Sequence, residues 1–217
     1  MHWLALMAFL LQTASPVYIT TYIDVQPTAT SQGATLVRQY RQASRADSGN
    51  IAADAFQEIS RPSRFVVIEV WKDQASFEAH EKAAPTGQFR ERLKAIHHSP
   101  YDQRVSHGFA IDPAPQAAAD DALFTVTHVD VPPPSREQTE AAVKRVAEES
   151  RKQSGHVRYD VFQQNDPRTN HFTVFAAWKS NKEFDTNGAN PATVQFRETM
   201  GPMLGALYDE RLYKALK

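Results

Sequence analysis

Glu69, Trp71 and His80 are the residues whose types and spacing could carry acid–base chemistry. Glu69 and Trp71 are two residues apart in an apolar, β-branched stretch, so in a strand their side chains share one face. His80 follows in a segment of helix formers, with Phe77 three residues before it on the same helical face. Histidine is the natural general base near neutral pH, and a carboxylate beside it would orient its ring. If the strand and the helix are neighbours, these residues predict a proton-accepting site with an aromatic wall.

Each of these residues also has a structural interpretation, and the sequence leaves both interpretations open. His80 could lie on the helix surface while Glu69 pairs with a nearby Lys or Arg, because both types are common at exposed positions. Trp71 could belong to the core rather than to the wall of a pocket for a flat aromatic ligand. Tyr22, in the middle of an earlier apolar stretch, could supply a phenol to a pocket or pack at a sheet interface.

Other catalytic chemistries lack the residues that they need. The chain has no cysteine, which excludes disulfides, thiolate nucleophiles, iron–sulfur clusters and Cys-type zinc sites. No Gly-rich phosphate loop and no Gly-x-Ser-x-Gly motif occurs in the sequence, so binding of NAD, FAD or ATP has no support. Several histidines show no metal-ligand spacing, and we therefore expect no metal site. These histidines are His97, His98, His107, His156 and His171.

The elements that must position the candidate residues occur twice, because the chain repeats itself. Asp24 and Asp130 lie in matching segments at an offset of 106 residues, and after a one-residue insertion the offset becomes 107. Matching segments are Tyr18–Pro27 with Phe124–Pro133, Ser44–Gly49 with Ser150–Gly155, and Trp71–Lys72 with Trp178–Lys179. Self-similarity at a fixed offset indicates a duplicated structural unit. We expect repeats over 16–111 and 123–217, joined at 112–122 by a linker rich in Ala, Pro and Asp.

Each unit has the pattern β-α-β-β-α-β. In the first unit, β-branched and aromatic runs predict strands at 18–25, 51–59, 65–72 and 101–109. Helical spacing predicts helices at 28–46, 73–82 and 86–96, with Asp73 as the N-cap of the second. This order is typical of a split βαβ fold, with an antiparallel sheet covered by helices on one face. The other face of the sheet would be apolar, so we expect the two sheets to pack against each other.

A longer pattern runs through the first unit and identifies a family likeness. It consists of Asp54-x-Phe56-Gln57, Arg64-Phe65, Glu69-x-Trp71, Phe77-x-x-His80 and Phe89. This pattern resembles the antibiotic biosynthesis monooxygenase family, above all its members regarded as quinol monooxygenases. The resemblance covers nearly the whole chain after Pro16, once per repeat. It implies an α+β fold of two ferredoxin-like βαββαβ repeats, which form a dimeric α+β barrel within one chain, with ligand cavities between sheet and helices.

The resemblance also implies a cofactor-independent monooxygenase acting on a quinol, a polyphenol or a similar electron-rich aromatic. His80 would be the base that removes the phenolic proton and Glu69 would orient it, and the phenolate would then react with O2 without flavin or metal. The pocket wall would be formed by Trp71, Phe77, Phe89 and Tyr22. The second repeat has Ala176 and Asn187 where the first has Glu69 and His80. We therefore expect the chemistry in the first repeat only.

Two other functions fit the same resemblance. One is a non-catalytic module that binds a hydrophobic small molecule in the same barrel and needs no base. The other is a haem-binding or haem-degrading protein in which His80 ligates iron. Fold alone does not decide among them, because one scaffold hosts many functions.

Composition and the N-terminus narrow the partners and the compartment. Lys and Arg number 24 against 25 Asp and Glu, so the chain lacks the positive charge of a nucleic-acid binder. The apolar run near the start is too short to span a bilayer and suits the apolar part of a secretory signal peptide. We expect residues 1–15 to be a signal peptide or an apolar N-terminal arm, and the protein to be periplasmic or secreted, or cytoplasmic in the second case. The internal pseudo-dimer leaves further homo-oligomerisation open.

Overall fold

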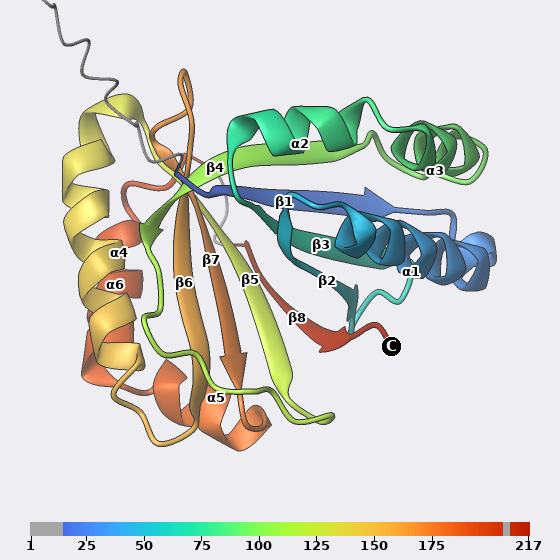
Figure 1. Cartoon of the computed structure of the whole chain (residues 1–217). Helices are drawn as coiled ribbons and strands as arrows, with labels where there is room; N and C mark the ends of the chain where they lie inside the picture. The colour runs from blue at the N-terminus through green and yellow to red at the C-terminus, as the bar shows by residue number, and fades with distance from the viewer. Residues whose placement is uncertain (1–14, 206–208) are drawn as a thin grey trace, which may run out of the picture.

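The two repeats have the same order of helices and strands (Figure 1) in the computed structural model, which describes residues 15–205 and 209–217. The first repeat contains β1 (Val17–Asp24), a 3-10 helix (Pro27–Ala29), α1 (Thr30–Ala46), β2 (Asn50–Glu58), β3 (Arg64–Trp71), α2 (Gln74–Glu81), α3 (Ala84–Lys94) and β4 (Asp102–Ala110). The second contains β5 (Leu123–Asp130), a 3-10 helix (Pro133–Ser135), α4 (Arg136–Ser150), β6 (His156–Gln164), β7 (His171–Trp178), α5 (Asn181–Gly188), α6 (Pro191–Met200) and β8 (Asp209–Ala215). The expected signal peptide or apolar arm at 1–15 lies, but for its last residue, outside the described residues.

Local sequence signals set the element boundaries near the site. Pro27 begins the 3-10 turn that leads into α1, where its fixed φ and missing N–H cost nothing. The Asp73 side chain accepts a hydrogen bond of 2.7 Å from the Ser76 N–H, which confirms Asp73 as the N-cap of α2. A short turn at 59–63 joins β2 to β3, which pair as an antiparallel hairpin with Phe56 opposite Val66.

The described strands form one closed barrel in the order β1-β3-β2-β8-β5-β7-β6-β4. Within each repeat the strands are antiparallel neighbours, and two further pairings join the repeats. One is the pairing of β2 with β8, in which Phe56 lies opposite Ala215. The other is the pairing of β4 with β6, in which Ser106 lies opposite Gln164. The expected intramolecular α+β barrel is confirmed, and closure leaves neither sheet with an open edge.

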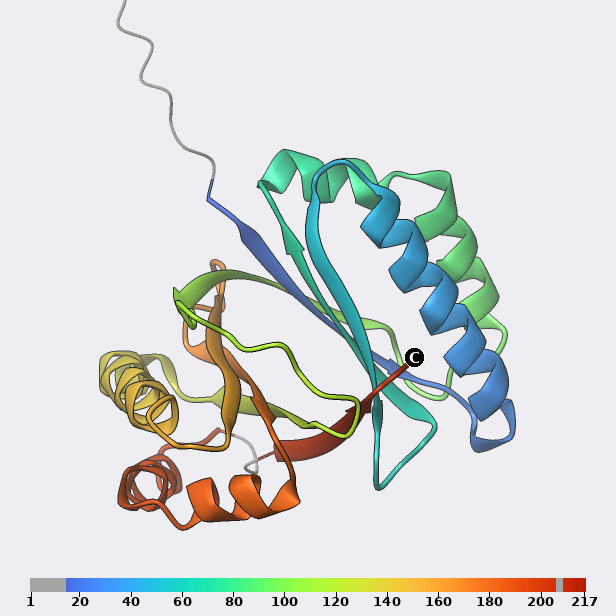
Figure 2. The same cartoon turned by 60° about the horizontal axis from the view of Figure 1, so that its bottom comes forward.

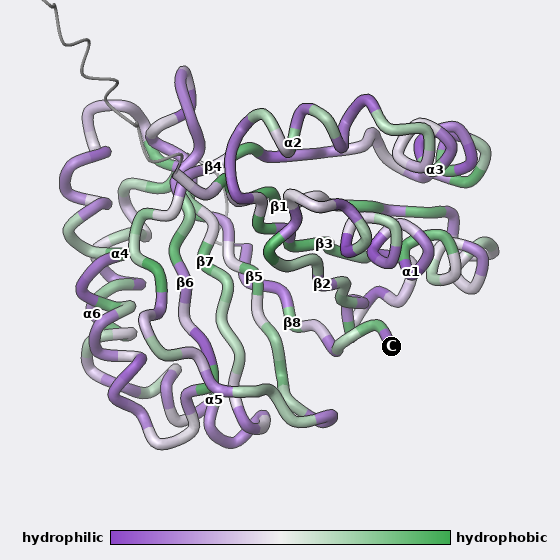
Figure 3. Tube along the Cα trace, viewed as in Figure 1, coloured by the Kyte–Doolittle hydropathy of each residue, from purple (hydrophilic) through white to green (hydrophobic). Residues whose placement is uncertain are grey.

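Helices cover the outside of the barrel and leave its interior to the strands (Figure 2). The side chains of each sheet alternate between a core under its helices and a shared core inside the barrel. The shared core contains Phe56 and Ile68 from the first repeat and Phe124, Phe162 and Phe175 from the second. Hydrophobic stretches are visible along β3 and β5, which contribute to these cores (Figure 3). No helix among the described residues is long and apolar enough to cross a membrane.

Candidate active site

Strand β3 places Glu69 and Trp71 on the face that is turned toward the helices. Val66 and Ile68 point into the barrel, whereas Trp71 packs with Phe77 in the layer under the helices. The predicted alternation along this strand is therefore confirmed. Glu69 and Trp71 are both completely buried. A glutamate is almost never buried in this way unless a partner satisfies it, so its surroundings need an explanation.

Helix α2 brings His80 over this face of the sheet. The Asp73 cap fixes the start of the helix, and Phe77 and His80 are its buried residues. The His80 ring lies against the Trp71 indole, with ring centroids 4.5 Å apart. The His80 side chain is only 1% exposed, so the interpretation of His80 as a helix-surface residue does not hold. Strand and helix converge as the spacing of these residues predicts.

Both ring nitrogens of His80 have oxygen partners. Nδ1 lies 2.7 Å from Oδ2 of Asp47, a residue of the turn between α1 and β2. Nε2 lies 3.1 Å from the Tyr40 hydroxyl and 3.2 Å from the Thr86 hydroxyl. With Asp47 ionised, Nδ1 carries the proton that it donates to the carboxylate, and Nε2 is the accepting nitrogen. Asp47 thus occupies the orienting position that the sequence analysis expected of Glu69.

Glu69 is connected to His80 through Tyr40. The Tyr40 hydroxyl donates a hydrogen bond of 3.0 Å to Glu69 Oε2, while Glu69 Oε1 lies 3.9 Å from His80 Nε2. Burial raises the pKa of Glu69 above its ordinary value, and the neighbouring His80 acts in the opposite direction. Burial, and next the Glu69 carboxylate, also raise the pKa of the Tyr40 phenol well above its ordinary value. The four groups form a chain Asp47–His80–Tyr40–Glu69 along which a proton can move.

The surroundings of this chain are aromatic and contain unsatisfied polar atoms. Phe89 stacks on the Tyr40 ring with centroids 4.4 Å apart, and Phe77 lies 6.5 Å from Trp71. Within the described part of the chain, Glu69 Oε1 and Trp71 Nε1 are buried without a hydrogen-bond partner. Buried polar atoms are normally satisfied, so such exceptions mark a place where a ligand or a water could bind.

A cavity of about 360 Å³ lies beside the chain, and Asp47, Trp71 and His80 are among its lining residues. Asp47, whose side chain is 42% exposed, is the member of the chain that opens to solvent. Gly49 and Ser76 line the same cavity, and they approach each other so closely that a Cβ atom on Gly49 would lie 2.6 Å from Ser76 Oγ. The volume is within the range of small-molecule sites.

The second repeat has lost this polar chain as a unit. The residues at the positions of Tyr40, Asp47, Glu69 and His80 are Val146, Gln153, Ala176 and Asn187. The packing neighbours survive, with Trp178, Thr193 and Phe196 at the positions of Trp71, Thr86 and Phe89. Four hydrogen-bonding partners that change together, while their surroundings persist, indicate that they serve one purpose in the first repeat.

The space that corresponds to the cavity beside Gly49 and Ser76 is also filled in the second repeat. Glu183 stands at the position of Ser76, and its Cβ and Cγ atoms pack directly on Gly155, which corresponds to Gly49. The Glu183 carboxylate is held there by a hydrogen bond from the Ser180 hydroxyl. Trp71 lines the cavity of the first repeat, whereas in the second repeat the Glu183 side chain occupies the corresponding space over Gly155. This difference agrees with the expected location of the chemistry in the first repeat.

Of the expected wall residues, Trp71 lines the cavity, Phe77 and Phe89 pack against the chain without lining it, and Tyr22 lies away from this site altogether. It projects into the barrel, on the other face of its sheet, and lines a separate cavity of about 350 Å³ at one barrel mouth. The Arg104 guanidinium lies 4.7 Å from the centre of the Tyr22 ring. Burial raises the pKa of Tyr22 to about 12, so the phenol is neutral at physiological pH. Its expected contact with the substrate of His80 therefore has no geometric support.

Sequence reasoning missed Tyr40, Asp47 and Thr86 as members of the site. Tyr40 is in the middle of α1 and Asp47 is just after that helix, far in sequence from His80. A signal was nevertheless present, because Tyr40 and Asp47 change to Val146 and Gln153 between the repeats, as Glu69 and His80 also change. Thr86 gave no such signal, since the second repeat keeps it as Thr193.

Comparison with known families agrees with this geometry. The family model described as antibiotic biosynthesis monooxygenase matches the chain twice, over residues 16–92 and 122–199. The chain belongs to the antibiotic biosynthesis monooxygenase family. The "Putative monooxygenase YcnE" of Bacillus subtilis (strain 168) is 29% identical over 86 residues, which are 40% of this chain and 90% of that protein. That relative therefore corresponds to one repeat.

Solved structures of the same architecture extend over both repeats. A monooxygenase-like protein of Fusobacterium nucleatum subsp. nucleatum aligns with a TM-score of 0.80 at 14% identity, covering 94% of each chain. One from Lactobacillus acidophilus NCFM gives 0.72 at 15% identity, covering 94% of this chain and 95% of its own. An anthrone oxidase-like protein gives 0.73 at 9% identity, covering 94% and 92%. At such identities these likenesses show the fold alone, so other solved proteins share the architecture of both repeats.

Proposed function

We propose that this family member is a cofactor-independent monooxygenase that oxidises a quinol or a similar electron-rich phenol in the first repeat. The observation that carries the proposal is the buried chain Asp47–His80–Tyr40–Glu69, which borders a cavity in one repeat and is missing from the other. A structural role alone would need the packing residues and not four coupled hydrogen-bonding groups. Buried titratable groups at a cavity are the arrangement expected of an acid–base site.

The proposed reaction begins with removal of the phenolic proton. Asp47 opens to the cavity and His80 lies directly behind it, so the Asp47–His80 pair is the proton acceptor. The resulting phenolate is electron-rich enough to reduce O2. One oxygen atom then replaces the hydrogen on a ring carbon and the other leaves as water. The hydroxylation of the ring C–H bond and the oxidation of the quinol to the quinone each supply two electrons, so the products are a hydroxyquinone and water. The reaction balances without a flavin or a metal.

Tyr40 and Glu69 extend the acceptor into the protein. A proton on His80 can move through the Tyr40 hydroxyl to Glu69, whose raised pKa allows it to hold a proton. This would return the Asp47–His80 pair to its accepting state while the phenolate reacts. Trp71 supplies an aromatic surface beside the acceptor, which suits a flat ring.

Oxygen uptake by the tag-free, chelator-treated protein with a panel of quinols tests the proposal, with the enzyme-free rate subtracted. His80→Ala should lower kcat/KM by roughly 10²–10⁴-fold, the usual contribution of a positioned base. Asn187→Ala, at the matching position of the second repeat, is the control and should leave the rate unchanged. Equal rates for wild type and His80→Ala would contradict the proposal.

The two alternatives predict different results. A non-catalytic binding module would bind a quinol, detected by quenching of tryptophan fluorescence, with no turnover in wild type. A haem protein would need His80 to ligate iron, and the residues fit that role poorly. Each ring nitrogen of His80 is within hydrogen-bonding distance of an oxygen, so iron would have to displace Asp47 or both hydroxyls. A Soret band that is lost in His80→Ala would nevertheless favour this alternative.

A further inference from the structure

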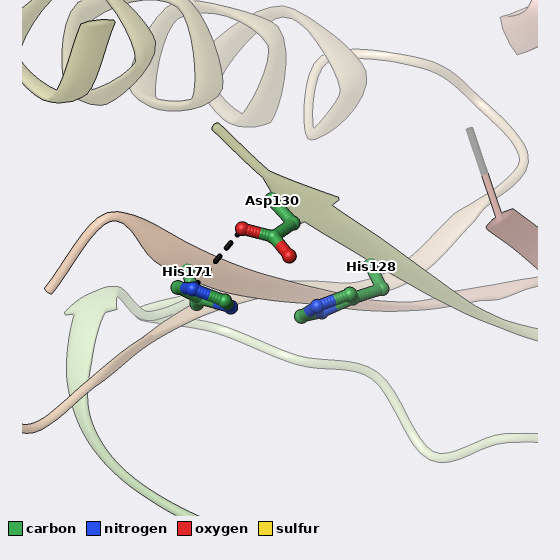
Figure 4. Close-up of side chains that lie close together, drawn as sticks. All are labelled: His128, Asp130 and His171. Atoms are coloured by element: carbon green, nitrogen blue, oxygen red, sulfur yellow. Dashed lines mark ion pairs between the residues drawn. The ribbon is translucent and has the colours of Figure 1, made fainter. Parts of the chain in front are cut away.

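A second cluster of titratable side chains lies at one mouth of the barrel, away from His80. It consists of His128, Asp130 and His171 (Figure 4). His128 and Asp130 are two residues apart on β5 and follow Phe124 and Val126 on the face that lines the barrel. His171 lies directly opposite Asp130 on β7. Two paired strands of a closed barrel thus hold all three side chains on one surface.

The distances within this cluster suit a metal ion. His171 Nε2 lies 3.1 Å from Asp130 Oδ1, and the two imidazole rings have centroids 5.8 Å apart. One ligand atom from each residue can be chosen so that all three lie within 4.8 Å of one another. A tetrahedral site with arms of about 2.0–2.1 Å needs ligand atoms about 3.4 Å apart. Small side-chain rotations therefore suffice to close the cluster around an ion.

The first repeat provides an internal comparison for this cluster. The residues at the same three positions are Tyr22, Asp24 and Arg64. There Arg64 Nε pairs with Asp24 Oδ2 at 3.0 Å, which is a plain salt bridge with a permanent cation. The second repeat keeps the carboxylate but has imidazoles in place of both the phenol and the guanidinium. That exchange replaces a salt bridge by three groups that can all donate electron pairs to one ion.

We propose that His128, Asp130 and His171 form a half-open binding site for a divalent first-row transition-metal ion such as Zn²⁺. Two imidazoles and one carboxylate suit ions of this class and are less suited to Ca²⁺ or Mg²⁺, which prefer oxygen ligands alone. The side chains of Asp130 and His171 are 29% and 19% exposed, so an ion can enter from solvent and keep water ligands. The site lies in the second repeat and is independent of the proposed oxygenase.

Arg104 is the neighbour with which the ion must compete. Its NH1 group lies 2.6 Å from His128 Nδ1, so the Arg104 guanidinium already provides this nitrogen with a hydrogen-bond partner. Asp102 holds the same guanidinium through contacts of 2.8 Å to NH2 and 3.2 Å to Nε, so Arg104 can release His128 and stay neutralised. Arg168 adds longer-range positive charge near His171. The Arg104 guanidinium therefore disfavours the ion by its positive charge and occupies one of the two His128 nitrogens that could bind it.

Titration of the tag-free full-length protein with Zn²⁺ by calorimetry, and with Co²⁺ by visible absorption, tests the site. Wild type should bind one equivalent, and Zn²⁺ should raise the unfolding temperature. His128→Tyr and His171→Arg install the residues of the first repeat, so both variants should fold. Each should weaken binding by more than the roughly 10–100-fold that loss of an outer partner of a metal site costs. Arg104→Gln should tighten binding, because it removes the competing cation.

A double variant, His97→Gln with His98→Gln, removes an adjacent histidine pair outside the cluster and should bind like wild type. Any of three results would overturn the site. These are the absence of metal binding in wild type, retained affinity in either His128→Tyr or His171→Arg, and unchanged or weaker binding in Arg104→Gln. Circular dichroism of each variant confirms that loss of binding is not loss of fold.

Discussion

At the scale of single residues, the candidate site depends on a carboxylate that is distant in sequence from the histidine it orients. Asp47 contacts His80 Nδ1 at 2.7 Å from a turn, and an ionised carboxylate there favours the tautomer whose Nε2 accepts a proton. A substitution that removes the charge of Asp47 but keeps a hydrogen-bond acceptor tests the acid–base role of Asp47 without changing the orientation of the His80 ring. Asp47 is therefore the residue at which the proposed function can be tested most selectively.

Asp47→Asn should lower the kcat of quinol oxidation by roughly 10²-fold or more and leave KM nearly unchanged. The amide oxygen can still accept the Nδ1 proton, so the ring stays in place, but the neutral amide no longer stabilises the protonated imidazole. Steady-state oxygen uptake measures both constants. Gln153→Ala, at the matching position of the second repeat, should behave like wild type. An unchanged kcat in Asp47→Asn would remove Asp47 from the mechanism.

Glu69 gives a prediction about stability and pH. Its folded-state pKa is raised, so the stability associated with its neutral form is fully present below the ordinary value of 4.5 and is lost as pH rises through the raised value. Glu69→Gln stays neutral and should not lose stability over that window. The free energy of unfolding of the variant, measured in urea, should therefore increase relative to that of wild type as pH rises from 4.5 to neutrality. Glu78→Gln, at an exposed position, should show no such gain.

Sequence reasoning reached part of the site, and the reason is the range of the interactions. Glu69 and Trp71 share a face of one strand, and His80 follows on the next helix, so strand and helix periodicity was enough to associate them. Tyr40 and Asp47 come to His80 only through tertiary contacts, because α1 packs beside α3 over the sheet and its side chains reach His80 of α2. No local pattern encodes that approach. Tyr22 shows the converse, because a residue on the neighbouring strand, paired with Val66 of β3, can still face the opposite side of the sheet from Glu69.

At the scale of elements, the entrance of the cavity depends on the close approach of α2 to the start of β2. The first and second repeats both have glycine at this point, as Gly49 and Gly155, and in both a Cβ atom would collide with the helix. The element order and the Asp73 cap followed from local propensity and capping chemistry, and both are confirmed. The close contact between Gly49 and Ser76 could not be predicted in this way, because it is made between two different elements.

Gly49→Ala should destabilise the protein by about 1–3 kcal/mol, since the new methyl group must push Ser76 and the start of α2 outward. Gly87→Ala is the matched control, because Gly87 lies within α3 and a Cβ atom there meets nothing within 4 Å. Alanine at that position should instead stabilise by roughly 0.5–1 kcal/mol through helix propensity. Urea unfolding of the two variants should thus give shifts of opposite sign, and shifts of the same sign would contradict the close contact.

At the scale of the whole molecule, the two repeats are one structural unit because they share a core. The duplication and the family resemblance predicted the barrel, and the order of its strands confirms it. The pairings of β2 with β8 and of β4 with β6 join strands of different repeats that are distant in sequence, so their register had no sequence signal. The apolar inner face of each sheet indicated only that a partner sheet was needed.

A shared core predicts that damage on one side of the barrel spreads to both repeats. Phe162 belongs to the second repeat, is completely buried, and stacks on Tyr18 of the first with centroids 4.8 Å apart. Phe162→Ala should cost about 3–5 kcal/mol, a large part of the 5–15 kcal/mol that stabilise a typical domain. Trp71 and Trp178 can report each repeat separately by fluorescence, in backgrounds where the other tryptophans are Phe. In both backgrounds the urea midpoint should fall by the same amount, because the barrel unfolds as one cooperative unit.

Val194→Ala, at an exposed position of α6, should move neither midpoint by much. A shift confined to the Trp178 signal would mean that the repeats unfold independently in spite of the closed barrel.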